Sequence, residues 1–389
     1  MPTPGRSSPL CRWARGVPPR RLNTAPALPS RVTDLPVGAL GEASVVVADP
    51  KAGSQLHNKG SHGTPLSGGA LELSLLEAAY LVEAGRLRVD RADGSAASFE
   101  DLATMGGSQD GAFGVRYVVY RDLRERGYVV RPSTTPGVDL EVLPRGAPVK
   151  GGERMWMLAV SERASFATTP FLELVHRAEA MGRKLLIGVV DEEGDVTHYR
   201  AQVREMGGGL PRTAAEGAPE LGGWAFEDRV VTYDLESADA LAPPGQLGRR
   251  LGSSHQLSLI EAVWLARAGR LRLRDASTGA GMSTAELEAR ARRTQADFEL
   301  RLRVYTDLRE RGLVAKTGFK YGTHFRAYEE DPEGHHARFL VHAVPRDHET
   351  SWPELSRAVR LAHGVRKEMV FGAAGEGGVE YLKIRRVRP

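Results

Sequence analysis

One stretch of this chain occurs twice, and that repetition limits the possible folds more than any other feature. LSLLEAAYLVEAGRLRV at Leu73 returns as LSLIEAVWLARAGRLRL at Leu257, and VYRDLRERGYVV at Val119 returns as VYTDLRERGLVA at Val304. The offsets are 184 and 185 residues, so order and spacing are both kept. Solenoid repeats are only about 20 to 50 residues long. The 389 residues are therefore expected to fold as two tandem copies of one unit.

Both copies show the same order of predicted elements. Apolar residues at helical spacing precede Gly85, and a longer helix ends before Gly127 in the first copy and Gly312 in the second. On this second helix, the charged run from Arg309 to Arg311 predicts a solvated face with acid–base pairs. Two strands, one helix and two further strands follow. We expect a mixed α/β (α+β) fold, with an N-terminal helix–strand subdomain and a C-terminal mixed-sheet subdomain in each copy.

We place the first copy at residues 40–225 and the second at 226–389. Residues 1–39 differ in composition, because the first forty residues hold six arginines and eight prolines but one acid. We expect a disordered leader there, since such a segment buries too little apolar surface to fold alone. A nucleic-acid-binding arm, a transit peptide and a start codon set too far upstream are the alternatives for this segment.

The composition excludes several classes of protein. No run approaches eighteen apolar residues, so no transmembrane span is predicted. The single cysteine, Cys11, excludes an intramolecular disulfide framework and a cysteine-based zinc site. The net charge of +4 permits a polyanionic partner without requiring one. We expect a cytoplasmic protein.

A hairpin near the C-terminus distinguishes the second copy from the first. FRAYEEDPEGHHARFLVHAV, from Phe325 to Val344, predicts two strands around an acidic turn that contains glycine. Tyr328 precedes the turn, and His336 follows it. Alignment of the copies pairs Tyr328 with Leu143 and His336 with Gly152. A residue needed only for folding would be expected in both copies, so this asymmetry favours a chemical role; a packed tyrosine and an exposed histidine are the alternatives.

Lys367, aligned with Lys184 of the first copy, adds a cation to the phenol and the imidazole. Three such groups suffice for RNA cleavage without metal: one removes the proton of a ribose 2′-hydroxyl, another protonates the leaving 5′-oxygen, and the cation stabilises the phosphate charge. Tyrosine is a weak base because its ordinary pKa is about 10, but a neighbouring lysine is expected to favour the phenolate. A metal site of His335, His336 and His342 is disfavoured, because adjacent strand residues point to opposite faces.

The second copy resembles the archaeal tRNA-splicing endonucleases and their eukaryotic catalytic-subunit relatives. The resemblance rests on GFKYGTHFRAY, HHARFLVHAV and RLAHGVRK in that order and spacing, together with the repeated helical segments. It covers the chain from about residue 40 to the end and implies a nuclease-like C-terminal subdomain in each copy. The family's catalytic triad carries over to Tyr328, His336 and Lys367, with His335 as the competitor of His336.

The resemblance also implies an activity. Such enzymes cleave precursor tRNA at bulge–helix–bulge intron boundaries as metal-independent RNA lyases without cofactors, leaving 2′,3′-cyclic phosphate and 5′-hydroxyl ends. The alternative is a non-catalytic RNA-binding or scaffold protein on the same fold. Two arginines in this family clamp a flipped bulge base, a task that suits planar guanidinium groups. They match Arg360, which aligns with Arg177, and Arg386, for which Arg385 and Lys383 compete.

The tandem arrangement is similar to the family's two-unit homodimeric class. There the first unit is a catalytically inactive structural copy, and Leu143 and Gly152 agree with that. The structural copy docks an acidic loop into a basic pocket beside the partner's catalytic unit. An ordinary solvated turn is the alternative reading of the matching acids, which are Asp191, Glu192, Glu193 and Asp195.

Overall fold

In each sequence repeat a strand runs directly into a helix, and the two helices begin with the same hydrogen bonds. In the first copy β4 (Leu71–Ser74) runs into α2 (Leu75–Glu83), and in the second β16 (Ser254–Ser258) runs into α7 (Leu259–Arg267). Each helix starts with a capping box, in which a serine and a glutamate three residues later satisfy each other's backbone N–H groups. The sequence duplication is thus a duplication of local structure.

The computed structural model describes residues 35–145, 153–210, 220–241 and 246–389. The predicted leader lies outside the described residues up to position 34, as does Cys11. The first three residues of strand β1 (Val37–Leu40) lie inside the segment predicted to be disordered. Strand β13 (Leu221–Ala225) pairs with strands of the second copy, so the sheet of that copy begins five residues before the predicted boundary.

Each N-terminal subdomain is a six-stranded sheet with helices packed on it. The order is β3-β4-β2-β1-β5-β6 in the first copy and β15-β16-β14-β13-β17-β18 in the second, the same arrangement in both. The remaining elements of the first are β2 (Ser44–Val47), α1 (Pro50–Gly60), β3 (Thr64–Pro65), the 3-10 helix η2 (Ser67–Gly69), β5 (Arg88–Asp90), β6 (Ala96–Ala97) and α3 (Phe99–Gln109). Those of the second are β14 (Arg229–Thr232), α6 (Leu235–Leu241), β15 (Arg249–Leu251), β17 (Leu271–Asp275), β18 (Gly281–Met282) and α8 (Thr284–Thr294).

The C-terminal subdomains share one ten-stranded sheet. Its order, β19-β20-β21-β23-β24-β12-β11-β9-β8-β7, runs through corresponding strands from both edges to the middle, where β24 pairs antiparallel with β12. The first copy contributes α4 (Phe113–Glu125), β7 (Val129–Pro132), β8 (Leu140–Leu143), β9 (Met155–Ser161), β10 (Ser165–Ala167), α5 (Thr168–Ala180), β11 (Lys184–Val190) and β12 (Val196–Val203). The second contributes α9 (Phe298–Glu310), β19 (Val314–Thr317), the 3-10 helix η3 (Phe319–Tyr321), β20 (Phe325–Tyr328), β21 (Phe339–Pro345), β22 (Glu349–Ser351), α10 (Trp352–Gly364), β23 (Glu368–Gly375) and β24 (Gly378–Arg386).

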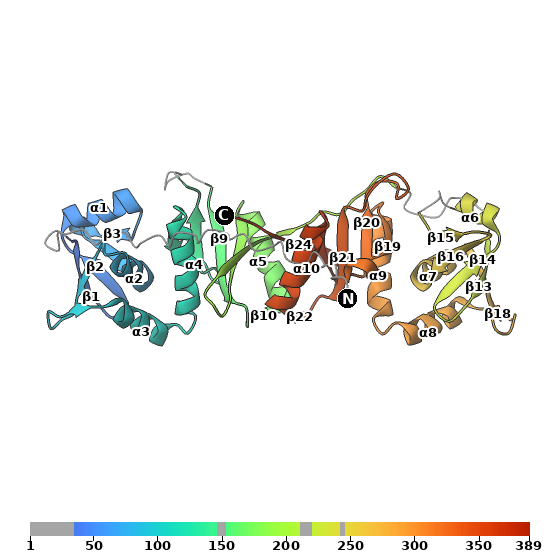
Figure 1. Cartoon of the computed structure of the whole chain (residues 1–389), viewed down its shortest axis with the longest axis horizontal. Coiled ribbons are helices and arrows are strands. Elements are labelled where there is room, and N and C mark those ends of the chain that lie inside the picture. The colour runs from blue at the N-terminus through green and yellow to red at the C-terminus, as the bar shows by residue number, and fades with distance from the viewer. Residues whose placement is uncertain (1–34, 146–152, 211–219, 242–245) are drawn as a thin grey trace, which may run out of the picture.

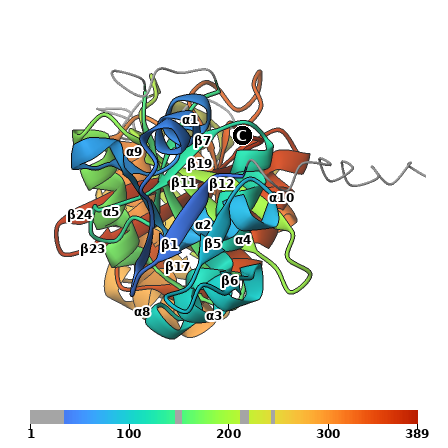
Figure 2. The ribbon, with the colours of Figure 1, turned by 90° about the vertical axis from the view of Figure 1, so that its left-hand side faces the viewer.

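The molecule is therefore a row of three bodies, with the shared sheet in the middle and an N-terminal subdomain at each end (Figure 1). Viewed along the row, the ribbon has a roughly round outline, so the molecule is elongated along this one axis only (Figure 2). Helices α5 and α10 pack on one face of the sheet around a common apolar core that includes Phe171, Tyr199 and Trp352. Helices α4 and α9 pack on the other face, where their cores continue into the two N-terminal subdomains.

One helix in each copy was missed, and one prediction about a helix face was wrong. The longer helix expected before Gly127 and Gly312 is present as α4 and α9, but a further helix, α3 or α8, precedes it across a short turn and was not predicted. Arg309 does not lie on a solvated face. Its side chain is buried, with the guanidinium 5.1 Å from the ring centre of Trp264, because α9 turns this side toward α7. Arg311 does make an ion pair of the expected kind, with Asp307.

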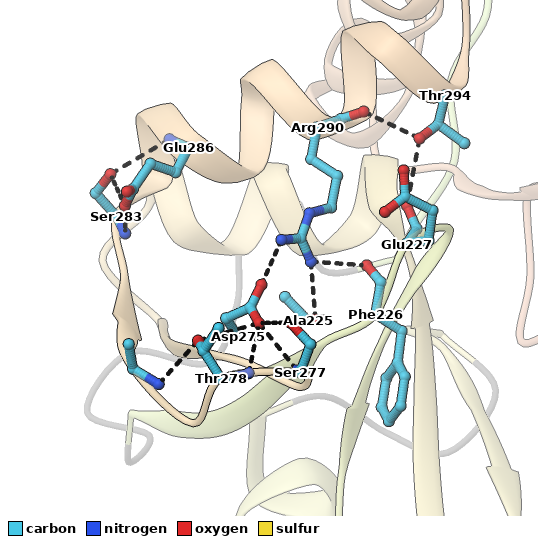
Figure 3. Close-up of polar contacts among 11 residues, drawn as sticks. Ala225, Phe226, Glu227, Asp275, Ser277, Thr278, Ser283, Glu286, Arg290 and Thr294 are labelled. Carbon is cyan, nitrogen blue, oxygen red and sulfur yellow. Dashed lines mark hydrogen bonds and ion pairs between the residues drawn. The ribbon is translucent and has the colours of Figure 1, made fainter.

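Arg290 fixes helix α8 to the end of the second N-terminal sheet (Figure 3). Its guanidinium donates to the carbonyl oxygens of Ala225 and Phe226 at 2.9 and 3.2 Å and pairs with Asp275. Hydrogen bonds from Ser277, followed by the Arg290 contact, hold the pKa of the Asp275 carboxyl well below its ordinary value. The carboxylate is thus ionised at neutral pH and keeps α8 in place against the sheet.

Candidate active site

The hairpin predicted from the sequence is present, between β20 and β21. Ala327 pairs with Phe339 and Phe325 with Val341 in antiparallel register. The next strand along the sheet, β23, runs parallel to β21 and begins one residue after Lys367. The connection between β20 and β21 carries His335 and His336, and both of these side chains are exposed.

Ala337 contacts both Tyr328 and Lys367, and it directly follows His336 in the chain. The buried Tyr328 side chain packs in a small apolar cluster with Val314 and Ala337. The ammonium of Lys367 donates to the Ala337 carbonyl oxygen at 2.7 Å. Because His336 is the residue before Ala337, the three predicted side chains extend from one connected group of atoms.

The environment of the Tyr328 phenol differs from the prediction. Burial raises the pKa of Tyr328 above its ordinary value, and the Arg326 guanidinium, 5.7 Å from the ring centre, offsets this only in part. The Lys367 ammonium is hydrogen bonded to a carbonyl and lies 5.9 Å from the Tyr321 ring. The expected lowering of the phenol pKa by lysine was therefore wrong, because desolvation outweighs the nearby positive charge.

The two histidines lie in the loop before β21 and not in a strand, so strand alternation does not separate them. The His335 imidazole is engaged, with Nε2 2.9 Å from Glu330 and Nδ1 3.2 Å from the Asp331 carbonyl oxygen. The His336 imidazole makes no hydrogen bond or ion pair with any residue that the structure describes. This difference favours His336 as the group available to a ligand.

The first copy has the same strands without the same side chains. Leu143 is paired with Val129 as Tyr328 is paired with Val314, which confirms the alignment of these two positions. Leu143 is buried in the first copy. Gly152, the predicted counterpart of His336, lies outside the described residues.

The predicted counterparts of Lys367 and Arg360 were each wrong by one residue. The N–H of Lys367 donates to Ala362, and the N–H of Arg183 donates to Ala178 in the matching turn. Lys367 therefore corresponds to Arg183. Lys184 instead pairs with Glu153 at 2.5 Å.

The same offset of 184 residues between the starts of α5 and α10 makes His176 the counterpart of Arg360. It also makes Arg366, whose φ is 55°, the counterpart of Gly182, whose φ is 64°. An arginine thus occupies the left-handed region where the first copy uses glycine, and it stands directly before Lys367. Such a conformation costs an L-residue roughly 1–2 kcal/mol.

The two predicted clamp arginines lie on one face of the sheet. Arg360 donates to the Ser356 hydroxyl at 3.1 Å, and that hydroxyl lies 2.6 Å from the Tyr199 hydroxyl. Arg386 is the direct cross-strand neighbour of Tyr199, so its side chain leaves the same face. Lys383 and Arg385 alternate to the opposite face, where Lys383 pairs with Glu368 at 2.8 Å. Geometry therefore favours Arg386 over both competitors.

Sequence reasoning missed an ion-pair network behind the hairpin. Arg338 pairs with Glu329 at 2.9 Å and with Glu368 at 3.3 Å, tying the two ends of the histidine loop to the start of β23. Arg204, which follows β12 of the first copy, lies 3.8 Å from both carboxylates. The segment continues to Leu210, which packs beside Tyr328. No local pattern signals these contacts, because they join segments far apart in the chain.

The predicted acidic loop is the turn between β11 and β12. Asp191 accepts the N–H groups of Glu193 and Asp195 and so shapes the turn. Glu192 pairs with Arg163, and both side chains are exposed. The carboxylates of Glu193 and Asp195 form no ion pair with residues that the structure describes.

Within the described ranges, no three His, Cys, Asp or Glu side chains gather as metal ligands would. None of the described helices is long and apolar enough to cross a membrane.

Comparison with known families agrees with this architecture. Residues 113–198 and 298–381 match the tRNA intron endonuclease, catalytic C-terminal domain, and residues 37–103 match the tRNA intron endonuclease, N-terminal domain. The first two segments are the C-terminal subdomains of the two copies. The chain belongs to the tRNA intron endonuclease family.

Several archaeal relatives are similar over nearly their whole length. The tRNA-splicing endonuclease of Methanococcoides burtonii is 36% identical over 350 residues, which is 88% of this chain and 97% of the relative. That of Methanosarcina acetivorans is 37% identical over 89% of this chain and 98% of its own length. The tRNA-splicing endonuclease of Haloferax volcanii is 34% identical over 90% and 98%.

Proposed function

We propose that this protein excises introns from precursor tRNA by cleaving at bulge–helix–bulge boundaries, as a metal-independent RNA lyase. The observation that carries the proposal is the meeting of Tyr328, Lys367 and the His336 segment at Ala337. The first copy has the buried Leu143 in place of the phenol and serves as the structural copy. Family membership supports the substrate class.

In this proposal Tyr328 takes the proton of the 2′-hydroxyl next to the scissile phosphate. The 2′-oxygen then bonds to phosphorus, the bond from phosphorus to the 5′-oxygen breaks, and His336 gives that oxygen a proton. The products are a 2′,3′-cyclic phosphate and a 5′-hydroxyl. One proton of the Lys367 ammonium holds Ala337, and the other two are available to the charge that builds on the phosphate.

The exposed imidazole of His336 fits the role of the acid better than His335, whose ring is already paired with Glu330. Arg360 and Arg386, on the sheet face covered by α10, are proposed to stack on the flipped bulge base.

A homodimer follows from the acidic turn. In a two-fold dimer each chain offers one such turn and one catalytic copy, so both contacts form at once. The carboxylates of Glu193 and Asp195, which pair with no base in the described part of the chain, support this docking. The exposed pair of Glu192 with Arg163 is weak enough to be exchanged. Replacing Asp191, Glu192, Glu193 and Asp195 together by Ser should lower the mass seen by light scattering and slow cleavage, more so at high salt. Normal mass and cleavage would reduce this segment to a solvated turn.

One experiment distinguishes the proposed enzyme from a non-catalytic scaffold. The purified chain is incubated with a bulged precursor tRNA in EDTA, and the ends of any fragments are identified. Cleavage with cyclic phosphate ends supports the proposal, whereas binding without cleavage supports the scaffold. Loss of cleavage in EDTA alone would indicate a metal-dependent nuclease. We place the reaction in the cytoplasm because the expected substrate is precursor tRNA.

A further inference from the structure

A hollow of about 270 Å³ lies on the outer face of the second N-terminal sheet. Its lining comes from β13, β17 and the end of β14, and strands β13 and β14 lie at the end of the row of three bodies (Figure 1). The hollow shares no lining residue with the larger cleft that Tyr328 lines. Sites that enclose a whole small ligand usually measure about 300–1,000 Å³, so a hollow of this size suits one part of a longer molecule.

The aromatic and charged residues that line it are Trp224, Tyr233, Asp234, Arg272 and Arg274. We refer to this site as the outer hollow.

The strand pattern explains why these side chains point outward. Gly222 pairs with Arg272, and Trp224 pairs with Arg274, in the parallel register of β13 and β17. The residues that alternate with them in both strands are buried in the apolar core. Because successive side chains of a strand point to opposite faces, the tryptophan and both arginines leave the sheet on the same side.

The hollow exposes two aromatic rings. Tyr233 is 62% exposed and Trp224 is 36% exposed, although tryptophan is highly buried on average. A side chain added at Gly222 would meet no other atom within 4 Å, so close packing does not require glycine there. The glycine instead leaves the space beside the two rings unfilled.

The two arginines are available to an anion. Arg274 donates to the Gly279 carbonyl oxygen at 3.2 Å and makes no ion pair with any residue that the structure describes. Arg272 pairs with Glu220 at 3.2 Å, but both side chains are exposed. An exposed pair of this kind contributes little and is readily exchanged for another anion.

The acid of the lining, Asp234, has a structural task. Its carboxylate accepts the N–H of Ser237 at 3.0 Å, at the start of α6. Asp49 accepts the N–H of Ala52 at 2.9 Å in the same way at the start of α1. This acid is therefore common to both copies.

The first copy shows which of the other side chains the fold needs. Gly38 and Gly223 identify the matching positions, because a side chain added at either would collide with a valine of the next strand, Val45 or Val230. The strand partners on either side of Gly38 follow the same parallel register as those around Gly223. The last pair comes from the residues that directly follow β2 and β14.

Five matched positions differ on this face. The first copy has Val37, Ala39, Ala48, Arg88 and Asp90 where the second has Gly222, Trp224, Tyr233, Arg272 and Arg274. In the first copy Asp90 pairs with Arg88 at 2.7 Å and so neutralises it. Because the backbone arrangement is the same in both copies, the fold does not account for two additional aromatic rings and one additional arginine. A ligand with stacking surfaces and negative charges does.

We propose that the outer hollow binds an unpaired segment of the RNA substrate. One base stacks on Trp224, and the adjoining phosphates pair with Arg272 and Arg274. Bases stack on aromatic side chains when they are not paired and stacked in a helix, and arginine binds phosphate through two parallel hydrogen bonds. The inference rests on the proposed function, because it takes precursor tRNA as the ligand.

The bound nucleotides lie outside the two bulges, because the outer hollow shares no residue with the cleft that Tyr328 lines. Exposed tryptophan, tyrosine and arginine are also frequent at protein interfaces. A protein partner, however, would have to bring acids to two neighbouring arginines. RNA offers a base and a phosphate at every nucleotide and meets both requirements at once.

The test variant gives this face two side chains of the first copy, as Trp224→Ala with Arg274→Asp. The matched control makes the same two changes at exposed residues of the same subdomain that do not line the hollow, as Phe226→Ala with Arg293→Asp. Two RNAs are compared at one salt concentration, because phosphate contacts depend strongly on salt. One is a complete precursor tRNA, with unpaired nucleotides outside the bulges, and the other is trimmed to the two bulges and the paired helices beside them.

For the complete RNA we expect the test variant to bind on the order of tenfold more weakly than the control, which is the usual contribution of one stacked base. Affinity for the trimmed RNA should match that of the control, because no unpaired strand reaches the hollow. Single-turnover cleavage at saturating RNA should stay within about twofold of wild type, since only substrate binding is changed.

Two single variants isolate the stacking and serve also if the double variant is unstable. Trp224→Phe should keep most of the affinity for the complete RNA, because phenylalanine still offers a ring, whereas Trp224→Ala should lose it. Equal losses in these two variants would contradict stacking at this position.

Equal affinity of the test and control variants for the complete RNA would overturn the inference, and so would equal weakening with both RNAs. A test variant that binds RNA normally but loses dimer mass in light scattering would assign the outer hollow to a protein contact instead. A wild-type protein that binds the complete RNA without cleaving it would defeat the proposed function alone, because the binding comparison would still decide the role of the hollow.

Discussion

The ammonium nitrogen of Lys367 lies 2.7 Å from the carbonyl oxygen of Ala337, the residue that follows His336. Lysine thereby holds the end of the histidine loop against the start of β23. Its effect on cleavage should therefore have two parts, one from charge at the phosphate and one from the position of the imidazole.

Replacing Lys367 by Met should slow single-turnover cleavage by about 10²–10³-fold, the usual loss when one donor to a developing oxyanion is removed. Affinity for the RNA should change far less. Lys184→Met is the matched control, because Lys184 is paired with Glu153 in the first copy. A control that loses as much activity as Lys367→Met would contradict the assignment of chemistry to the second copy alone.

His336→Ala should slow cleavage by about 10²–10⁴-fold, the usual contribution of a general acid. The neighbouring His335→Ala should remain close to wild type, because that imidazole is occupied by Glu330. Both are measured under single-turnover conditions with the same bulged RNA. The reverse order of effects would show that the acid is His335.

Tyr328 predicts a particular pH profile. Its pKa is raised by burial, so the phenol is neutral throughout pH 6–9 and only a small fraction is ionised. If Tyr328 is the base, the rate of the chemical step in the His336→Ala background, where no imidazole acid takes part, should rise about tenfold per pH unit over this range. Tyr328→Phe should remove that rise while leaving thermal stability nearly unchanged. A flat profile in the His336→Ala background would assign the phenol to positioning.

The unfolding free energy of the protein should depend on pH through His324. Its Nδ1 accepts the N–H of Ala343 at 3.0 Å. Burial, then the His342 and Arg301 charges, lower its pKa to about 4, and the Asp297 charge opposes this only in part. Because the pKa of this histidine is lower in the folded than in the unfolded state, the neutral ring stabilises the fold at pH values above the ordinary histidine pKa of about 6.5. That stabilisation is lost as the pH falls toward about 4. We expect a loss of about 2 kcal/mol in unfolding free energy over that interval, allowing for solvent screening.

The matched variant is His324→Asn, which keeps an acceptor for Ala343 but cannot titrate, as Asp139 keeps one for Ala159 in the first copy. Urea unfolding at several pH values should show a weaker acid dependence for this variant. Identical curves for the two proteins would place the acid sensitivity in other groups, His342 first among them.

Arg366 is expected to store strain. Because its φ is 55° where the first copy has Gly182, Arg366→Gly should raise the unfolding free energy by about 0.5–1 kcal/mol, and Gly182→Arg should lower it. Denaturant midpoints measure both. No gain from Arg366→Gly would mean that contacts of the arginine offset the strained backbone.

Local patterns predicted local structure well. The helical spacing before Gly85 corresponds to α2, and the alternation around Tyr328 corresponds to the hairpin of β20 and β21, because both patterns join residues close together in the chain. The alignment of Lys367 with Lys184 was wrong for a physical reason: side-chain identity suggested one register, whereas the glycine-like backbone of Arg366 sets another. Arg309 was misjudged because burial of a guanidinium against Trp264 depends on the packing of α7, which charge pattern does not reveal.

The candidate site was predictable only as a set of side chains. That Lys367 donates to a backbone carbonyl, that Leu210 covers Tyr328 and that Arg386 shares a face with Tyr199 all depend on contacts between distant segments. The pairing of β12 with β24 is of the same kind, since neither strand carries a local signal for its partner.

That central pairing has a consequence for how the two copies can diverge. If the copies were separate chains, random association would give three kinds of pair, and only the mixed kind would hold one Tyr328 copy and one acidic-turn copy. Covalent linkage raises the effective concentration of each copy for its own neighbour, so β24 meets β12 of the same chain first. Mispaired assemblies are thereby suppressed. The first copy can therefore lose the catalytic side chains, and the second copy can lose the acidic turn.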